Sequence, residues 1–279
     1  MKDPERPFVA SKASLIGSRG CNQDRCMILS NATSTLMVLA DGLGGHPRGE
    51  IAAQIMVDVC ETLFRHAPKP IPDPEHFMLQ CIGKAHQAIL RFGQRQEPPI
   101  APRTTAVLAM IQSGTAHWVH VGDSRLYLVR DGEIHRQTRD HTQIRFVRQS
   151  QEQASRARTS LTRCLGGVQE PPTTTCSSPT PLQQGDTLVL CSDGLWAQIP
   201  RGALAAAFAD PQHDIADCLN GLIEVALAKP NSDNVTGVAL RWLLPSNTSD
   251  DGLSPDDPQL KQAIRHLESV LKENQEPSQ

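Results

Sequence analysis

Short apolar segments alternate with turn residues over residues 36–240, and this pattern predicts a set of β-strands. The predicted strands are Leu36 to Ala40, Thr105 to Ile111, Ala116 to Val121, Arg125 to Val129, Thr187 to Cys191 and Val235 to Leu240. Between His117 and Gln137, turn residues at 122–124 and at Asp131–Gly132 lie where hairpins would close. Because hairpins join antiparallel strands, we expect an antiparallel sheet.

Apolar residues spaced three or four apart predict helices between these strands. Three stripes have this spacing: Ile51, Ile55, Val59 and Leu63; then Met78, Ile82, Ala85, Ile89 and Phe92; and then Ile215, Leu219, Leu222 and Ala226. The first helix would end at Ala67–Pro68, because proline cannot continue it. Groups of strands with amphipathic helices between them predict layered sheets with the helices packed outside.

The composition changes after Leu244, and this change suggests a domain boundary. The segment PSNTSDDGLSPDDPQ is polar, acidic and contains proline, and a helical stripe at Leu260, Ile264, Leu267 and Leu271 follows it. We expect an N-terminal arm over 1–13, a main domain over 14–244, an acidic linker over 245–258, and an amphipathic helix and tail over 259–279. That helix could bind a partner or dimerise, but docking on its own domain or fraying is the simpler expectation.

Composition narrows the classes of function. The 27 basic and 30 acidic residues give a net charge of -3, which argues against a general binder of nucleic acid or of membrane surfaces. No apolar run approaches the roughly 20 residues needed to cross a bilayer. The eight cysteines are irregularly spaced and several lie in apolar runs, so we interpret them as reduced thiols. We therefore expect a cytoplasmic protein, and the sequence does not indicate its oligomeric state.

Aspartates lie at or beside the ends of several predicted strands. Asp41, Asp123 and Asp193 each follow an apolar strand, Asp233 precedes one, and Asp24 lies between two strand-like stretches. Strand ends from distant parts of the chain converge on one rim of stacked sheets, so these carboxylates could meet in space. Like charges at such a rim repel and raise one another's pKa values, and a divalent cation removes that cost.

The donors in this set are oxygens without the Cys or His spacing of a zinc site, which favours Mg²⁺ or Mn²⁺. Four or five carboxylates suit two ions, about 3.5 to 4 Å apart, that share one aspartate. Asp41 is our candidate for that bridge, because the glycines after it allow a carbonyl or ligand to approach closely. A single Asp–Gly pair is most often a plain turn, and we interpret Asp131–Gly132 in that way.

Five motifs occur in one order along the chain: SRGCNQD (18–24), ADGLGGH (40–46), VGDSRLYLVRDG (121–132), CSDGLW (191–196) and SDNVTGVAL (232–240). Together they resemble the metal-dependent Ser/Thr protein phosphatases of the PPM family, also called protein phosphatase type 2C, in their compact bacterial form. The resemblance covers Ser14 to Trp242. It implies an α+β fold, the αββα sandwich of two antiparallel sheets flanked by helix pairs, with a binuclear Mn²⁺ or Mg²⁺ centre at one rim.

The resemblance also implies which residues bind metal. The expected ligands of the two ions are Asp41 as the bridge, Gly42 through its carbonyl, Asp193 and Asp233. Asp24 matches the family's N-terminal acidic position close to the metals. Asp123 would belong to a third, weaker metal site that bacterial relatives have.

Phosphoester hydrolysis follows from such a centre, because a water bridging two metals is acidified to hydroxide near neutral pH and no covalent phosphoenzyme is required. Arg19 matches the family's phosphate-binding arginine, whose planar fork suits two phosphate oxygens. His46 could protonate the leaving Ser or Thr alkoxide, or it could instead hydrogen-bond a metal-binding carboxylate. The expected substrate is a protein phosphorylated on Ser or Thr, in opposition to a Ser/Thr kinase.

The chain departs from the family pattern at two places. Gln23 replaces the glutamate of many relatives, and the flap between Asp140–His141 and SLTRCLGG is short. The arginines in and around the flap are Arg139, Arg145, Arg148, Arg156, Arg158 and Arg163. A basic flap would favour acidic or multiply phosphorylated substrates, unless this segment is a solvated helix face.

Two other functions compete with the phosphatase. One is a pseudophosphatase that binds a phosphoprotein without turnover, which Gln23 and the short flap would suit. The other is an unrelated metal phosphohydrolase that acts on small molecules. With 4% aromatic residues, the sequence gives no sign of an enclosing aromatic pocket, which favours a protein substrate.

Overall fold

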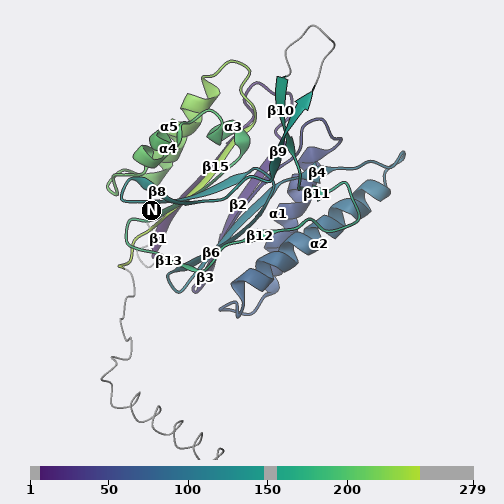
Figure 1. Ribbon diagram of the computed structural model, residues 1–279. Coiled ribbons are helices and arrows are strands. Elements are labelled where there is room, and N and C mark those ends of the chain that lie inside the picture. Colours follow the sequence, from purple (N-terminus) through teal and green to yellow (C-terminus); the bar gives the residue numbers. More distant parts are fainter. Residues whose placement is uncertain (1–6, 148–155, 246–279) are drawn as a thin grey trace, which may run out of the picture. The chain divides into compact units, whose positions relative to one another are not determined.

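Two antiparallel sheets form the centre of the protein in the computed structural model, which describes residues 7–147 and 156–245 (Figure 1). One sheet has the order β1 (Phe8–Leu15), β15 (Val235–Trp242), β14 (Thr187–Cys191), β7 (Arg125–Arg130) and β8 (Glu133–Gln137). The other has the order β12 (Thr175–Cys176), β6 (Thr115–Val121), β5 (Ala106–Gln112), β3 (Ser34–Asp41) and β2 (Asp24–Ser30), with β13 (Thr180–Pro181) also paired to β6. The strand pairs are antiparallel, as the hairpin turns predicted.

Strand β3 shows why the central strands are continuously apolar. Successive side chains of a strand point to opposite faces of the sheet. Leu36 and Val38 therefore pack in the apolar layer beneath α1 and α2, while Met37 and Leu39 pack in the layer between the two sheets. Because both faces of β3 are covered, the strand needs no alternation with polar residues.

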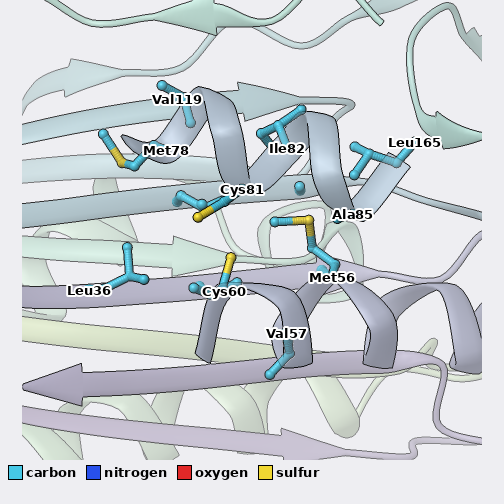
Figure 2. Packing of buried hydrophobic residues seen from close by; sticks show 14 of the residues in the cluster. Leu36, Met56, Val57, Cys60, Met78, Cys81, Ile82, Ala85, Val119 and Leu165 are labelled. Atoms are coloured by element: carbon cyan, nitrogen blue, oxygen red, sulfur yellow. The ribbon is translucent and has the colours of Figure 1, made fainter. Parts of the chain in front are cut away.

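Helices cover the outer face of each sheet. Helices α1 (Gly49–His66) and α2 (Pro74–Gln94) pack on the second sheet, and Figure 2 shows the apolar side chains between them. Helix α2 begins after Asp73, whose carboxylate accepts a hydrogen bond from the His76 amide at 2.9 Å. On the first sheet lie α3 (Asp193–Trp196), α4 (Arg201–Ala207) and α5 (Ile215–Leu227). The predicted αββα sandwich is confirmed.

The structure differs from the sequence expectation at the N-terminus. Residues 8–13, expected in an arm, belong to β1, which pairs with β15 from Phe8 opposite Trp242 to Leu15 opposite Val235. The edge strand has one partly exposed face, and polar residues such as Lys12 therefore weaken its apolar pattern. The predicted acidic linker and C-terminal helix lie almost wholly outside the described residues.

Shorter strands complete the fold near the rim that bears the aspartates. Strand β4 (Arg103–Thr104) pairs with β11 (Leu165–Gly166). The flap contains the antiparallel pair β9 (Thr142–Val147) and β10 (Arg156–Leu161), so in its described part it is a pair of strands and not a helix. No helix in the described part of the chain is long and apolar enough to cross a membrane.

Candidate metal centre

The aspartates predicted to bind metal come from adjacent strand ends of both sheets. Asp24, the first residue of β2, is paired directly with Asp41, the last residue of β3. Asp193 begins α3 immediately after β14, and Asp233 lies just before β15, the neighbour of β14. We call Asp24, Asp41, Asp123, Asp193 and Asp233 the carboxylate rim. Asp41 experiences the charges of the other four, so the structure brings the set together.

The backbone of Asp41 is fixed by two threonines that the sequence analysis did not single out. Its carbonyl accepts hydrogen bonds from the Thr105 amide at 2.8 Å and from Oγ1 of Thr104 at 2.9 Å. Its amide donates to Oγ1 of Thr105 at 3.0 Å, and that hydroxyl also contacts Oγ of Ser124 at 2.7 Å. Asp41 is thus tied to the turn that carries Asp123.

Two glycines beside the rim are required by close backbone contacts. A Cβ on Gly42 would lie 2.4 Å from the carbonyl of Gly49, and one on Gly194 would lie 2.1 Å from the carbonyl oxygen of Asn234. No side chain fits at such distances. The glycine after Asp41 therefore lets the start of α1 approach the rim, and the glycine after Asp193 lets α3 approach Asp233.

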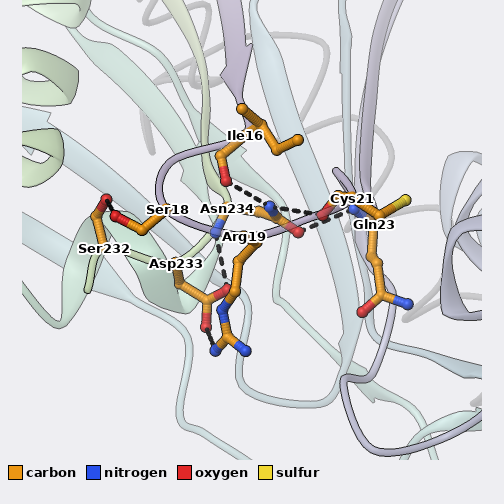
Figure 3. Close-up of polar contacts among 8 residues, drawn as sticks. All are labelled: Ile16, Ser18, Arg19, Cys21, Gln23, Ser232, Asp233 and Asn234. Atoms are coloured by element: carbon orange, nitrogen blue, oxygen red, sulfur yellow. Dashed lines mark hydrogen bonds and ion pairs between the residues drawn. The ribbon is translucent and has the colours of Figure 1, made fainter.

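Asn234 organises the loop that carries Arg19, as Figure 3 shows. Its amide nitrogen Nδ2 donates to the carbonyls of Ile16 at 2.8 Å and Cys21 at 3.0 Å, and its Oδ1 accepts from the amide of Gln23 at 2.9 Å. Asn234 was not predicted from the sequence, because an asparagine after an aspartate is typical of a plain turn. The signal available was its position within the SDNVTGVAL motif.

Arg19 lies at the outer edge of the rim. Its Nη2 is 2.6 Å from Oδ2 of Asp233, and the two side chains are 56% and 38% exposed. Asp233 uses its other oxygen, Oδ1, to accept a hydrogen bond from the Asn234 amide at 2.8 Å. The predicted phosphate-binding arginine and a predicted metal ligand are therefore in direct contact (Figure 3).

Burial and mutual repulsion make it hard for the rim to carry several negative charges. Burial raises the pKa of Asp24 from its ordinary 3.8 to about 7, and the charge of Asp193 acts in the same direction. Burial also raises the pKa of Asp123 to about 6, again with a contribution from Asp193. The pKa of Asp41 is raised well above its usual value by burial and then by the charge of Asp24. These carboxylates can all ionise together only if a cation compensates them.

The donor set suits Mg²⁺ or Mn²⁺. Its side-chain donors are carboxylate oxygens, and Oδ2 of Asp24 is buried without a hydrogen-bond partner. Among the described residues, no group of three or more His, Cys, Asp or Glu side chains could hold an ion as it stands. Asp233 directs its oxygens to Arg19 and to the Asn234 amide, so metal binding by Asp233 requires its carboxylate to give up these contacts. The chemistry of these residues fits a divalent cation.

His46 follows the glycines after Asp41 and precedes α1. Burial, followed by the charge of Arg103, lowers the pKa of its imidazole, which favours the neutral form. Its backbone amide donates to the Leu43 carbonyl at 3.3 Å, and Leu43 in turn donates to the carbonyl of Arg103 at 3.0 Å. The imidazole forms no hydrogen bond with another described residue, so the described contacts do not support the alternative in which it orients a carboxylate.

Gln23 lies beside a carboxylate from another element. Its Nε2 is 3.4 Å from Oε2 of Glu50, near the start of α1. Glu50 also lies 3.6 Å from Nη1 of Arg48. Gln23 is itself uncharged, but a carboxylate is present within contact distance of its amide.

The flap meets the rim through the residues at its base. His141 donates its backbone amide to the Gly122 carbonyl at 2.9 Å, and Oγ1 of Thr162 donates to the His141 carbonyl at 2.9 Å. Nη1 of Arg163 donates to the carbonyl of Thr173 at 3.4 Å. Side chains of residues 144–159 lie outside the description, so the preference for acidic substrates stays a prediction.

Comparison with known proteins gives consistent matches over the sandwich. The family model described as protein phosphatase 2C matches residues 13–224. The chain is 30% identical over 242 residues to the serine/threonine protein phosphatase PstP of Mycobacterium tuberculosis (strain CDC 1551 / Oshkosh), a match covering 82% of this chain and 45% of that protein. The chain thus spans less than half the length of that relative.

Solved structures agree with the sequence match. The S. agalactiae serine/threonine phosphatase superposes with a TM-score of 0.71 at 25% identity, covering 85% of this chain and 100% of that one. The catalytic domain of PstP in complex with two manganese ions has a TM-score of 0.66 at 30% identity, covering 85% and 99% of the two chains. Because the family model matches most of the sandwich, the chain belongs to the protein phosphatase 2C family.

Proposed function

We propose that this chain is a metal-dependent phosphoprotein phosphatase that hydrolyses phosphoserine and phosphothreonine with two Mn²⁺ or Mg²⁺ ions. The observation that carries the proposal is the carboxylate rim, where the buried Asp24 and four partly buried carboxylates from both sheets converge beside an exposed arginine. Membership of the protein phosphatase 2C family supports it. The substrate is a protein phosphorylated on Ser or Thr by an opposing kinase.

The metal ligands in this proposal are Asp41 as the bridge, the carbonyl of Gly42, Asp193 and Asp233. Asp24 adds a buried carboxylate whose Oδ2 is free to accept a cation or a hydrogen bond from a bound water. When bound, the two ions would lower the pKa of a water so that hydroxide is available near neutral pH, and they would neutralise charge on the phosphate oxygens. The threonine contacts to Asp41 hold its backbone in place, so that little reorganisation is needed.

Arg19 binds the phosphate group of the substrate. A guanidinium presents two parallel N–H groups to two phosphate oxygens, and a phosphomonoester dianion offers more charge than one carboxylate. The ion pair of Arg19 with Asp233 is largely exposed and is therefore weak. Transfer of Arg19 from Asp233 to the substrate leaves the Asp233 carboxylate available for metal.

His46 donates a proton to the leaving Ser or Thr oxygen. Its lowered pKa means that only a minority of molecules hold the imidazolium at neutral pH, but that imidazolium is a stronger acid. Arg103 is one cause of the lowered pKa, so the acidity of His46 depends on a neighbouring strand. The role predicts that hydrolysis of esters with poor leaving groups depends most strongly on His46.

The direct test measures phosphate release from a phosphothreonine peptide in Mn²⁺ and in EDTA, with the Asp193→Asn variant alongside. We expect turnover that requires metal and falls roughly a thousandfold in the variant, because the loss of one ligand removes several kcal/mol of transition-state stabilisation. Asp131→Asn is the matched control, since it also alters an Asp–Gly pair. Asp131 lies in the tight turn between β7 and β8 with a φ of 50°, which asparagine tolerates, so full activity is expected.

The same assay separates the competing functions. Faster turnover of small phosphomonoesters than of any phosphopeptide would favour a small-molecule phosphohydrolase. A folded wild-type protein that is inert in Mn²⁺ on peptides and small esters alike would refute the catalytic proposal. The rim would then serve as the phosphoprotein-binding surface of a pseudophosphatase.

A further inference from the structure

Trp196, the last residue of α3, forms a hydrogen bond to the turn that carries Asp123. Its indole Nε1 donates to the backbone carbonyl of Asp123 at 2.9 Å. Asp193, the first residue of the same short helix, belongs to the carboxylate rim. Helix α3 therefore carries both the Asp193 carboxylate and the Trp196 N–H group that binds the backbone of Asp123. The charge of Asp193 also raises the pKa of Asp123.

Arg125 contacts the Trp196 ring, and each of its side-chain nitrogens donates a hydrogen bond. The Cζ of Arg125 lies 3.4 Å from the ring centroid of Trp196. Its Nε and Nη2 donate to the two carboxylate oxygens of Asp140, each at 2.8 Å, and its Nη1 donates to the Tyr127 hydroxyl at 3.0 Å. Both partners of this ion pair are less than one fifth exposed. The guanidinium is thereby held over the indole ring.

The turn itself is held by the base of the flap. His141 donates its amide to the Gly122 carbonyl at 2.9 Å, and the Gly122 amide donates to Nδ1 of His141 at 3.2 Å. Ser124 is held on the other side by its contact with Thr105 at 2.7 Å. The residues flanking Asp123 are therefore fixed by Thr105, which lies between β4 and β5, and by the base of the flap, while Trp196 fixes the carbonyl of Asp123 itself.

We propose that Trp196 is a positioning residue for Asp123. Its indole N–H fixes the Asp123 carbonyl and so sets the carboxylate beside Asp193, where it contributes to cation binding. The proposal rests on the metal centre proposed above, but not on turnover. Neither the family match nor the motif that contains Trp196 assigns this role. A purely structural tryptophan would need only its ring, packed under Arg125 and against the apolar layer of α5.

Trp196→Phe separates these two roles, because phenylalanine retains an aromatic ring and lacks the N–H donor. The experiment titrates Mn²⁺ into the whole chain and measures free Mn²⁺ by electron paramagnetic resonance, with no substrate present. We expect affinity at the weakest Mn²⁺ site to fall about fivefold, the effect of one hydrogen bond. Trp242→Phe is the matched control, since Trp242 lies at the other end of β15 from Asp233, and it should bind Mn²⁺ as the wild type does.

A double-mutant cycle with Asp123→Ala shows whether Trp196 acts through Asp123. Asp123→Ala should abolish the weakest site, and Trp196→Phe should then cause no further loss of Mn²⁺ binding. Loss of Mn²⁺ affinity at the remaining, stronger sites when Trp196→Phe is added to Asp123→Ala would overturn the proposal, because the tryptophan would then act independently of Asp123. Unchanged Mn²⁺ binding in Asp123→Ala would overturn it too.

A second variant guards against misfolding of Trp196→Phe. Asp140→Asn leaves the indole in place, weakens the hold on Arg125 and also removes a negative charge that acts on Asp123, so a loss at the same Mn²⁺ site is expected. Failure of both Asp140→Asn and Trp196→Phe to alter that site would overturn the proposal. A wild type that binds Mn²⁺ but releases no phosphate would refute the phosphatase function, and the Mn²⁺ titrations would still decide the role of Trp196.

Discussion

The carboxylate rim and the interior between α1 and α2 both contain an acidic group, Asp41 and Cys60, whose pKa is raised by burial. Cys60 of α1 and Cys81 of α2 are fully buried and lie close together in Figure 2. Burial raises the pKa of the Cys60 thiol, with a further contribution from Cys81. Burial is also the largest cause of the raised pKa of Asp41.

The consequences differ because the two groups start from different acidities. A thiol is neutral at pH 7 even in water, so raising its pKa changes neither its charge nor the stability of the fold at that pH. A carboxylate in water is ionised at pH 7, so its burial either costs free energy or leaves it protonated. The thiols under α1 and α2 therefore need no compensating charge at pH 7, whereas the carboxylates of the rim can all be ionised only when cations are bound.

Removal of one rim charge gives the largest predicted effect. Asp41→Asn keeps the shape of the side chain, so we expect kcat/KM for a phosphopeptide to fall roughly a thousandfold through loss of the proposed bridging ligand. In EDTA the same variant should melt at a higher temperature than the wild type, because a buried group that is costly to ionise has been removed. Phosphate release and thermal denaturation measure the two effects, with Asp58→Asn on the exposed side of α1 as the control. A lower melting temperature in EDTA would contradict this view of the rim.

Truncation of a side chain in the apolar interior should lower stability and leave activity nearly unchanged. Met56 of α1 is fully buried, and Met56→Ala should lower the free energy of unfolding by about 3 kcal/mol, through lost burial and a cavity. The kcat/KM of the folded variant should stay close to that of the wild type. Urea denaturation measures the stability change, and Val225→Ala at the exposed face of α5 should change it by less than about 0.5 kcal/mol. A large loss of activity in folded Met56→Ala would show that the two regions are coupled.

The pH dependence of stability should give the smallest effect, a difference of a few degrees in melting temperature. The pKa of Asp24 is raised to about 7 and that of Asp123 to about 6, so between pH 4 and 7 the folded state binds more protons than the unfolded state. Stability of the metal-free protein should therefore fall as pH rises through this window. Mn²⁺ competes with these protons, so its stabilisation should grow over the same window. Melting curves at pH 5 and pH 8 with Mn²⁺ or EDTA test this, and an equal Mn²⁺ effect at both pH values would contradict it.

The sequence was most informative where local physics decides the structure. The stripe from Ile51 to Leu63 and Pro68 predicted α1, and the Asp131–Gly132 pair predicted the turn between β7 and β8. Residues 8–13 were missed because an edge strand with one partly exposed face lacks a strong apolar pattern. The sequence left open whether the flap is a helix or a pair of strands, because the spacing of its arginines fits neither structure distinctly.

The sequence by itself determined the layered fold and the residue types of the rim, because apolar periodicity and acidic motifs at strand ends are local properties of the chain. Only the tertiary structure decided which groups meet: Asp24 opposite Asp41, Arg19 on Asp233, and Trp196 under the Asp123 turn. These contacts join residues up to 214 positions apart. They depend on strand register and on sheet packing, which are set by the whole chain and not by any one segment.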